Sequence, residues 1–293
     1  GYACRSMASP SNTPILPASD PSISLLVVSG VIGLLGAWAY LEYLRRVRHD
    51  GPVLARRELL FGSLAMGAAL WASAVIALSA QGLPYVLGFH PVWLAASLGL
   101  PVVMTAIATY AVVAMPRLLM HLLAGLWFCA CALGTELLVV QSVSPTPSVE
   151  WRREPLAFGA LMVAIAFVIA LRMVIMQRRG SETDTRGRRF SAALLLAAAL
   201  AAHLELASVS SGLGRKFAAL HSKQLPEMAV ALAAGGVVPL MLMLMLIDQR
   251  MQARVRASSR KRQAREVKKT HVAEQKARVR RRRSAETAER PHV

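Results

Sequence analysis

Three side chains able to bind a metal ion or exchange a proton lie within long apolar stretches of the sequence. They are Cys129, Glu136 and His203, and a second carboxylate, Glu205, follows His203 closely. An ionisable group inside a bilayer is costly unless it is paired or faces a cavity, so such residues often mark functional sites. A thiolate with an imidazole suits copper or zinc better than magnesium. The residue types therefore indicate a polar or metal-binding site within the membrane.

Helix geometry limits how these residues can combine. At about 100° per residue, Cys129 and Cys131 project roughly 160° apart, as do His203 and Glu205. Cys129 and Glu136 share a helix face but are about 10 Å apart along its axis, so they are alternative ligands for one ion. A site must therefore combine residues from several helices. The alternative interpretation is that both glutamates are hydrated near the interface while His203 bonds to a neighbouring helix.

The elements that must position these residues are seven long apolar stretches. The chain of 293 residues is 55% hydrophobic and only 17% charged. Crossing a hydrocarbon core of about 30 Å takes about 20 apolar residues in a helix. The stretches are Leu25–Leu44, Leu59–Leu78, Val92–Val113, Leu118–Val140, Leu156–Met176, Phe190–Val209 and Met228–Ile247. They do not alternate as barrel strands would, so the sequence predicts an all-α polytopic membrane protein with seven transmembrane helices.

The distribution of basic residues predicts the orientation of these helices. Of the 34 Lys and Arg residues, six fall in the segments on one side of the membrane. These six are Arg5, Arg152, Arg153, Arg215, Lys216 and Lys223. All the others fall on the opposite side, which the positive-inside rule makes cytoplasmic. We therefore expect the N-terminus outside and the C-terminus inside.

The chain divides into an outer tail at 1–20, a membrane domain at 21–249 and a basic cytoplasmic tail at 250–293. In the membrane domain the first span stands alone, and the other six form three helix pairs. The pairs cover residues 57–114, 116–176 and 189–249, a repeat of about sixty residues that suits a two-span hairpin. Short outer segments at 79–91, 141–155 and 210–227 join the two helices of each pair. Pro239 is expected to kink the last span.

Enzymatic activity is not expected from this sequence. It contains no Ser/His/Asp set, no Gly-rich loop that would cradle a phosphate and no spaced Cys/His zinc motif. The run Met241, Met243 and Met245 is better explained as packing, since methionine fills apolar gaps well.

The rising helices of the three pairs carry related sequences. They read GAALWASAVIAL from Gly67, GLWFCACALGTE from Gly125 and AAALAAHLELA from Ala197. The first copy, with the following segments PYVLGFHP and WLAASLGLPVVMTAIATYAVV, resembles one repeat of the MHYT family. That family is a bacterial seven-span sensory domain with three repeats of a Met-His-Tyr-Thr-like motif. The resemblance covers about residues 20–249 and includes the lone first span.

The resemblance implies a copper site near the outer face that senses oxygen, carbon monoxide or nitric oxide. In that family the methionines and histidines of the motif are thought to bind the metal. Counted from the tryptophans, the methionine positions hold Ser73, Cys129 and Ala202, and the histidine positions hold Ala74, Ala130 and His203. The signature is therefore degenerate. The candidate metal ligands are Cys129 and His203, together with Glu136.

We expect an integral membrane sensory or signalling module in the bacterial inner membrane. It would respond to a diatomic gas or a metal at an outer-leaflet site and signal through the cytoplasmic tail. The alternative is a scaffold or anchor that kept the fold and lost the metal site. A small-solute transporter is less favoured, because the intramembrane polar residues form no chain across the bilayer.

The tail at 250–293 carries sixteen Lys and Arg residues against four Glu and contains no Phe, Tyr or Trp. Without aromatic residues it offers no stacking platform for bases, which disfavours nucleic acid as a partner. Attraction to anionic inner-leaflet lipids, about 1 kcal/mol per basic residue near the surface, explains the charge. Docking of an acidic cytoplasmic protein is the second interpretation.

Overall fold

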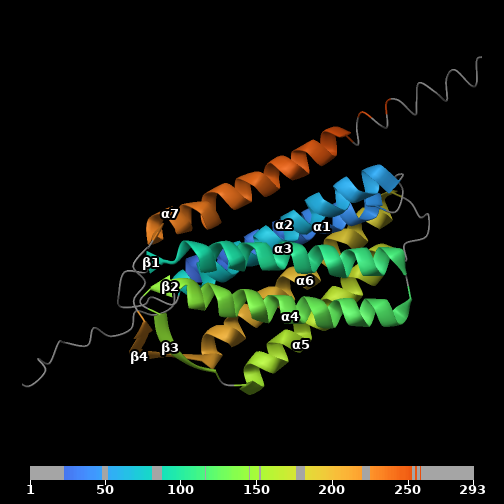
Figure 1. The fold of residues 1–293 in the computed structure, drawn as a ribbon. Helices are drawn as coiled ribbons and strands as arrows, with labels where there is room; N and C mark the ends of the chain where they lie inside the picture. Colours follow the sequence, from blue (N-terminus) through green and yellow to red (C-terminus); the bar gives the residue numbers. More distant parts are fainter. Residues whose placement is uncertain are drawn as a thin grey trace, which may run out of the picture. The chain divides into compact units, whose positions relative to one another are not determined.

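The computed structural model describes residues 23–47, 52–80, 88–115, 117–144, 146–151, 153–175, 182–219 and 225–252, together with residues 255 and 258. The outer tail at 1–20 lies outside the described residues, as does nearly all of the basic tail. Within this part of the chain the structure is built from helices that run side by side, with short strands gathered at one end (Figure 1).

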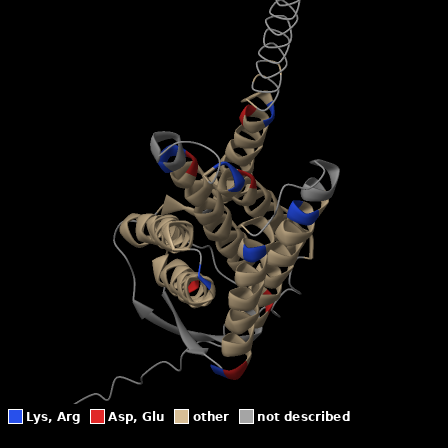
Figure 2. Cartoon of the chain, turned by 90° about the vertical axis from the view of Figure 1, so that its right-hand side faces the viewer, with Lys and Arg blue, Asp and Glu red and all other residues tan. Residues whose placement is uncertain are grey.

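Among the described residues, seven helices are long and apolar enough to cross a membrane, which confirms the predicted fold class. The first six are α1 (Ile23–Val47), α2 (Pro52–Ser79), α3 (Pro91–Ala114), α4 (Leu118–Ser142), α5 (Arg153–Ile175) and α6 (Glu182–Ser210). The seventh span, Met228–Gln252, begins with α7 (Glu227–Leu232) and continues through a π-helical turn, η1 (Ala233–Val237). Charged residues lie mostly near the helix ends, and long uncharged stretches separate them (Figure 2).

The first six helices pack in a closed circuit, each against the next and α6 against α1. The predicted lone span, α1, therefore has two neighbours, α2 and α6. Additional contacts join α2 to α4 and α6 and join α1 to α5, so side chains fill the interior. Helix α2 is the most enclosed: 78% of its membrane-spanning window is buried. Its small residues allow this close approach, because alanine and glycine let helix backbones come together.

Two small antiparallel sheets join the segments that connect the helices. Strands β2 (Val143–Ser144), β1 (Gly88–Phe89) and β5 (Leu225–Pro226) form one sheet, in that order. Strands β3 (Thr146–Trp151) and β4 (Ser211–Ala219) form the other. The three segments predicted to join the two helices of each pair are therefore tied to one another by main-chain pairing. We call this end of the bundle the strand end (Figure 1).

An aromatic stack crosses the middle of the bundle. The rings of Phe128 on α4 and Phe167 on α5 stack with centroids 4.0 Å apart, and the Tyr40 ring of α1 stacks on Phe167 at 6.0 Å. The Tyr40 hydroxyl makes a 2.8 Å hydrogen bond with the hydroxyl of Thr109 on α3. Four helices thus meet around one filled centre.

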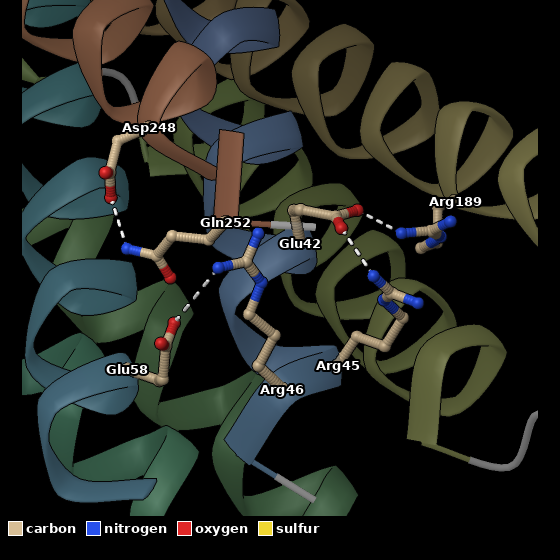
Figure 3. Close-up of polar contacts among 7 residues, drawn as sticks. All are labelled: Glu42, Arg45, Arg46, Glu58, Arg189, Asp248 and Gln252. Atoms are coloured by element: carbon tan, nitrogen blue, oxygen red, sulfur yellow. Dashed lines mark hydrogen bonds and ion pairs between the residues drawn. The ribbon is translucent and has the colours of Figure 1, made fainter. Parts of the chain in front are cut away.

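The opposite end, which we call the arginine end, is held by ion pairs. Glu42 near the end of α1 accepts hydrogen bonds from Arg45 and from Arg189 of α6 (Figure 3). Arg46 of α1 lies 3.9 Å from Glu58 of α2 and, like Glu58, is buried. These contacts connect α1 to both of its neighbours. The described residues from Met243 to Gln252 belong to a separate unit, in which Gln252 donates a 2.7 Å hydrogen bond to Asp248.

The π-helical turn η1 explains how the last span accommodates Pro239. Proline lacks an amide hydrogen, and its ring clashes with the carbonyl four residues earlier, here that of Gly235. The turn directly before the proline is widened, and the amide of Val238 bonds to the carbonyl of Ala233. The expected local distortion of this span is therefore present as a π-helical turn.

Two helical glycines provide a matched test of this packing. A Cβ on Gly67 of α2 would lie 2.6 Å from the backbone nitrogen of Val102, whereas a Cβ on Gly99 of α3 would meet nothing within 4 Å. We expect Gly67→Ala to lower the free energy of unfolding by about 1–3 kcal/mol, because α2 and α3 must separate. Gly99→Ala should be neutral or stabilising by up to about 1 kcal/mol. Reversible unfolding in mixed micelles measures both, and equal effects would contradict the close approach at Gly67.

Candidate functional site

Helices α4 and α6 bring two of the three predicted site residues together. Glu136 lies on α4 and His203 on α6, each within about two turns of the strand end of its helix. The His203 side chain is completely buried, and that of Glu136 is 8% exposed. The two residues are far apart in the sequence, so only the packing of the second and third helix pairs makes them neighbours.

The two side chains face each other at close range. Nε2 of His203 lies 3.3 Å from Oε1 of Glu136. Within the described part of the chain, neither carboxylate oxygen of Glu136 and neither ring nitrogen of His203 has a hydrogen-bond partner of good geometry. A buried polar atom without a partner costs about 1–3 kcal/mol, so this arrangement is expensive unless the pair attracts electrostatically or shares a proton. The site is therefore a buried, isolated pair of ionisable groups.

Gly159 of α5 makes room for the imidazole. A Cβ at Gly159 would lie 2.9 Å from Nδ1 of His203 and 3.2 Å from its Cα. Any larger residue would displace the ring or push α5 away from α6. Gly159 is thus a third component of the site, which positions the histidine and contributes no side chain of its own.

The third predicted ligand does not join this pair. Cys129 is partly exposed on α4, while Cys131 is buried beside Thr135, whose hydroxyl donates a 2.8 Å hydrogen bond to the Cys131 carbonyl. Glu205 is exposed on α6. Throughout the described ranges, no three or more His, Cys, Asp or Glu side chains form a group that would hold a metal ion.

Of the three metal ligands that the family resemblance implies, the described structure brings together only Glu136 and His203. Catalytic zinc sites commonly offer three protein ligands and structural ones four, whereas Glu136 and His203 supply one oxygen and one nitrogen. Their 3.3 Å separation is in the range of two ligands bound to one ion, but in the described part of the chain no third His, Cys, Asp or Glu completes the set. The described residues do not fit a metal centre of three or four protein ligands.

The first copy of the repeat serves packing instead. Ser73, at a position where the resemblance places a methionine, donates a 3.0 Å hydrogen bond to the Ser29 carbonyl of α1. Ser29 donates a 3.0 Å hydrogen bond to the Ser73 carbonyl in return. Nearby, the Trp71 indole donates to the hydroxyl of Ser97 on α3. These groups join α2 to both of its neighbours, so the first copy positions helices and offers no ligand.

Comparison of the chain with protein-family models, with curated proteins and with solved structures finds no match. The likeness to the MHYT family therefore rests on the sequence motifs alone. The geometry of the site stands independently of it.

A double-mutant cycle tests whether Glu136 and His203 interact. We expect Glu136→Gln and His203→Gln each to lower the free energy of unfolding by about 1–3 kcal/mol, since each leaves one buried partner behind. The double variant should lose less than the sum of the two single losses, with a coupling of about 0.6–1.7 kcal/mol, as found between membrane helices. Strict additivity would show that the two side chains do not interact.

Proposed function

We propose that this protein is an integral membrane sensory module whose receiving site is the Glu136–His203 pair. One observation supports this proposal above all: an acid and a base are buried 3.3 Å apart, and neither has a hydrogen-bond partner of good geometry in the described structure. A purely structural helix contact would be cheaper to build from apolar side chains, because each ionisable group pays for desolvation. Ionisable groups retained inside spans are often functional.

Helix α6 provides a path from this site to the other end of the bundle. His203 lies near its strand end, and Arg189 near its arginine end pairs with Glu42 of α1. A helix transmits a shift along its axis as a rigid element, so a change at His203 also reaches the Arg189–Glu42 contact. Helix α6 therefore connects the site to the arginine end.

The location of the module is inferred from its charge distribution and from its resemblance to the MHYT family. We place it in the bacterial inner membrane, with the arginine end and the basic tail on the cytoplasmic side. The tail contacts anionic lipids and carries the signal to an acidic cytoplasmic protein. The resemblance suggests copper and diatomic gases as ligands, and the pair supplies one oxygen and one nitrogen donor toward copper.

A non-sensing scaffold or anchor is the second candidate. The filled centre around Phe128 and Phe167 and the conversion of the first repeat copy into the Ser29–Ser73 contact both favour it. In this alternative, the Glu136–His203 contact only holds α4 against α6.

Hydrogen exchange on the full-length protein in nanodiscs distinguishes the two functions. For a sensory module, we expect at least one stimulus among pH, Cu⁺, Zn²⁺ and nitric oxide to alter exchange at the arginine end. The regions to follow are residues 42–47, 56–61 and 187–193. The expected change is about threefold to twentyfold, the range set by one polar contact between membrane helices.

Glu136→Gln and His203→Gln should each abolish this response. Glu154→Gln is the matched control, because this carboxylate is exposed at the start of α5, outside the pair. If no stimulus changes hydrogen exchange at the arginine end, the protein functions as the scaffold. A response that persists in both pair variants would locate the receiving site elsewhere.

A further inference from the structure

We propose that the start of α2 binds the headgroup of an anionic phospholipid, in the membrane leaflet at the arginine end. The site consists of Arg56 and Arg57, which bind the phosphate, and Leu60, which contacts the lipid chains. These residues belong neither to the Glu136–His203 pair nor to the basic tail. The inference therefore goes beyond the proposed sensory function and does not depend on it.

Arg56 and Arg57 lie at the depth of lipid headgroups. The part of α2 that can cross the membrane extends from Arg56 to Ser79 and has 24 residues. At 1.5 Å per residue this helix is about 36 Å long, whereas the hydrocarbon core is about 30 Å thick. Its first two residues, Arg56 and Arg57, are therefore at the boundary between the hydrocarbon and the phosphate layer. Leu60 lies one turn deeper, where the acyl chains begin.

The positive charge of these two arginines is not balanced by a described carboxylate. Both side chains are exposed, and neither forms an ion pair within the described part of the chain. The adjacent carboxylate, Glu58, is buried and lies 3.9 Å from Arg46 of α1, so it is already paired (Figure 3). The exposed face of this helix turn therefore carries two positive charges, which attract an anionic group of the membrane surface.

An aromatic ring positions one of the two guanidinium groups. The guanidinium carbon of Arg57 lies 5.3 Å from the centroid of the Phe61 ring, one helical turn further along α2. The Phe61 ring stacks on Tyr43 of α1, with centroids 6.0 Å apart. A ring face attracts a cation and restricts where it can lie. Arg57 is therefore held in place before a ligand arrives, which lowers the entropic cost of binding.

The apolar surface beside the arginines favours a lipid over a free phosphate ion. A guanidinium can donate two parallel hydrogen bonds to phosphate oxygens. Leu60 follows Arg57 by three residues and Arg56 by four, which places it on the same helix face, and it is 62% exposed. A phospholipid contacts both surfaces at once because its phosphate and its chains are covalently joined. A phosphate ion contacts the arginines alone.

Photolabelling of the full-length protein in nanodiscs tests this site separately from the basic tail. The probe is phosphatidylglycerol with a diazirine near the top of an acyl chain, diluted in phosphatidylcholine, and peptide mapping measures the label at residues 52–62. We expect about fivefold to thirtyfold more label than from the matching phosphatidylcholine probe, as one or two charge contacts near the membrane surface provide. Unlabelled phosphatidylglycerol should displace the probe, and inorganic phosphate at the same ionic strength should not.

Variants that keep the charge distinguish a site from diffuse attraction. The double variant Arg56→Gln and Arg57→Gln should reduce the excess label by about tenfold or more. Arg57→Lys keeps the charge but loses the planar pair of donors, so we expect a reduction of about twofold to fivefold. Phe61→Leu should act similarly, because the ring that positions Arg57 is lost. Arg117→Gln is the matched control: it removes an exposed arginine from the start of another helix and should leave the label at 52–62 unchanged.

Equal labelling by the two probes would overturn the site, as would displacement of the lipid by inorganic phosphate. The site is also overturned if the double glutamine variant loses the excess label while Arg57→Lys and Phe61→Leu both retain it, since diffuse charge then explains the preference. Because Phe61 also packs on Tyr43, Arg57→Lys alone decides this point if Phe61→Leu does not fold.

Discussion

The structure depends on one constraint: inside a hydrocarbon layer, each polar side chain must find its partner within the protein. The described bundle satisfies it in three ways. Serine and threonine hydroxyls bond to nearby backbone carbonyls, as Thr109 does to Thr105 and Thr135 to Cys131. Hydroxyls also pair across helices, as Tyr40 and Thr109 do. At the arginine end, Glu42 pairs with Arg45 and Arg189, and Glu58 pairs with Arg46. The buried Glu136 and His203 instead face each other at 3.3 Å, and neither makes a hydrogen bond of good geometry in the described structure.

The same constraint accounts for the density of the bundle. Helices in lipid gain little from hydrophobic burial against one another, so close packing and polar contacts must hold them together. Gly36 of α1 and Gly67 of α2 mark places where a Cβ would lie within 2.6 Å of a neighbouring helix. The nearly complete burial of α2 follows from this, because its alanine-rich sequence lets several helices approach at once.

The sequence alone predicted the fold well and the site in part. Seven apolar stretches of the required length left few alternatives, and each corresponds to a helix of the structure. Glu136 and His203 were recognisable because ionisable residues inside apolar stretches are rare. The contact between them could not be recognised from the sequence, because it depends on how the second and third helix pairs pack. Cys129 shares a helix face with Glu136, yet helical rise separates it along the axis. No sequence pattern distinguishes a residue near a site from a residue in it.

Two features escaped the sequence for different physical reasons. Strands β1 to β5 pair segments distant in the chain, and most are too short to show alternation; their pairing arises because the helices bring their ends together. Gly159 was visible as a small residue that permits close approach, but only the structure shows that the group approaching it is an imidazole. Because the backbone of Gly159 lies directly against the His203 ring, the ring has less room to move than it would have in a cavity.

The three copies of the repeat have therefore diverged in role. In the first copy, Ser73 joins α2 to α1 and offers no group that changes charge. The second copy contributes the acid of the site and the third contributes the base, from helices that meet only through the fold. Neither copy holds a complete site, and loss of either partner leaves a single buried ionisable group. Such a division couples the integrity of the site to the packing of α4 on α5 and of α5 on α6.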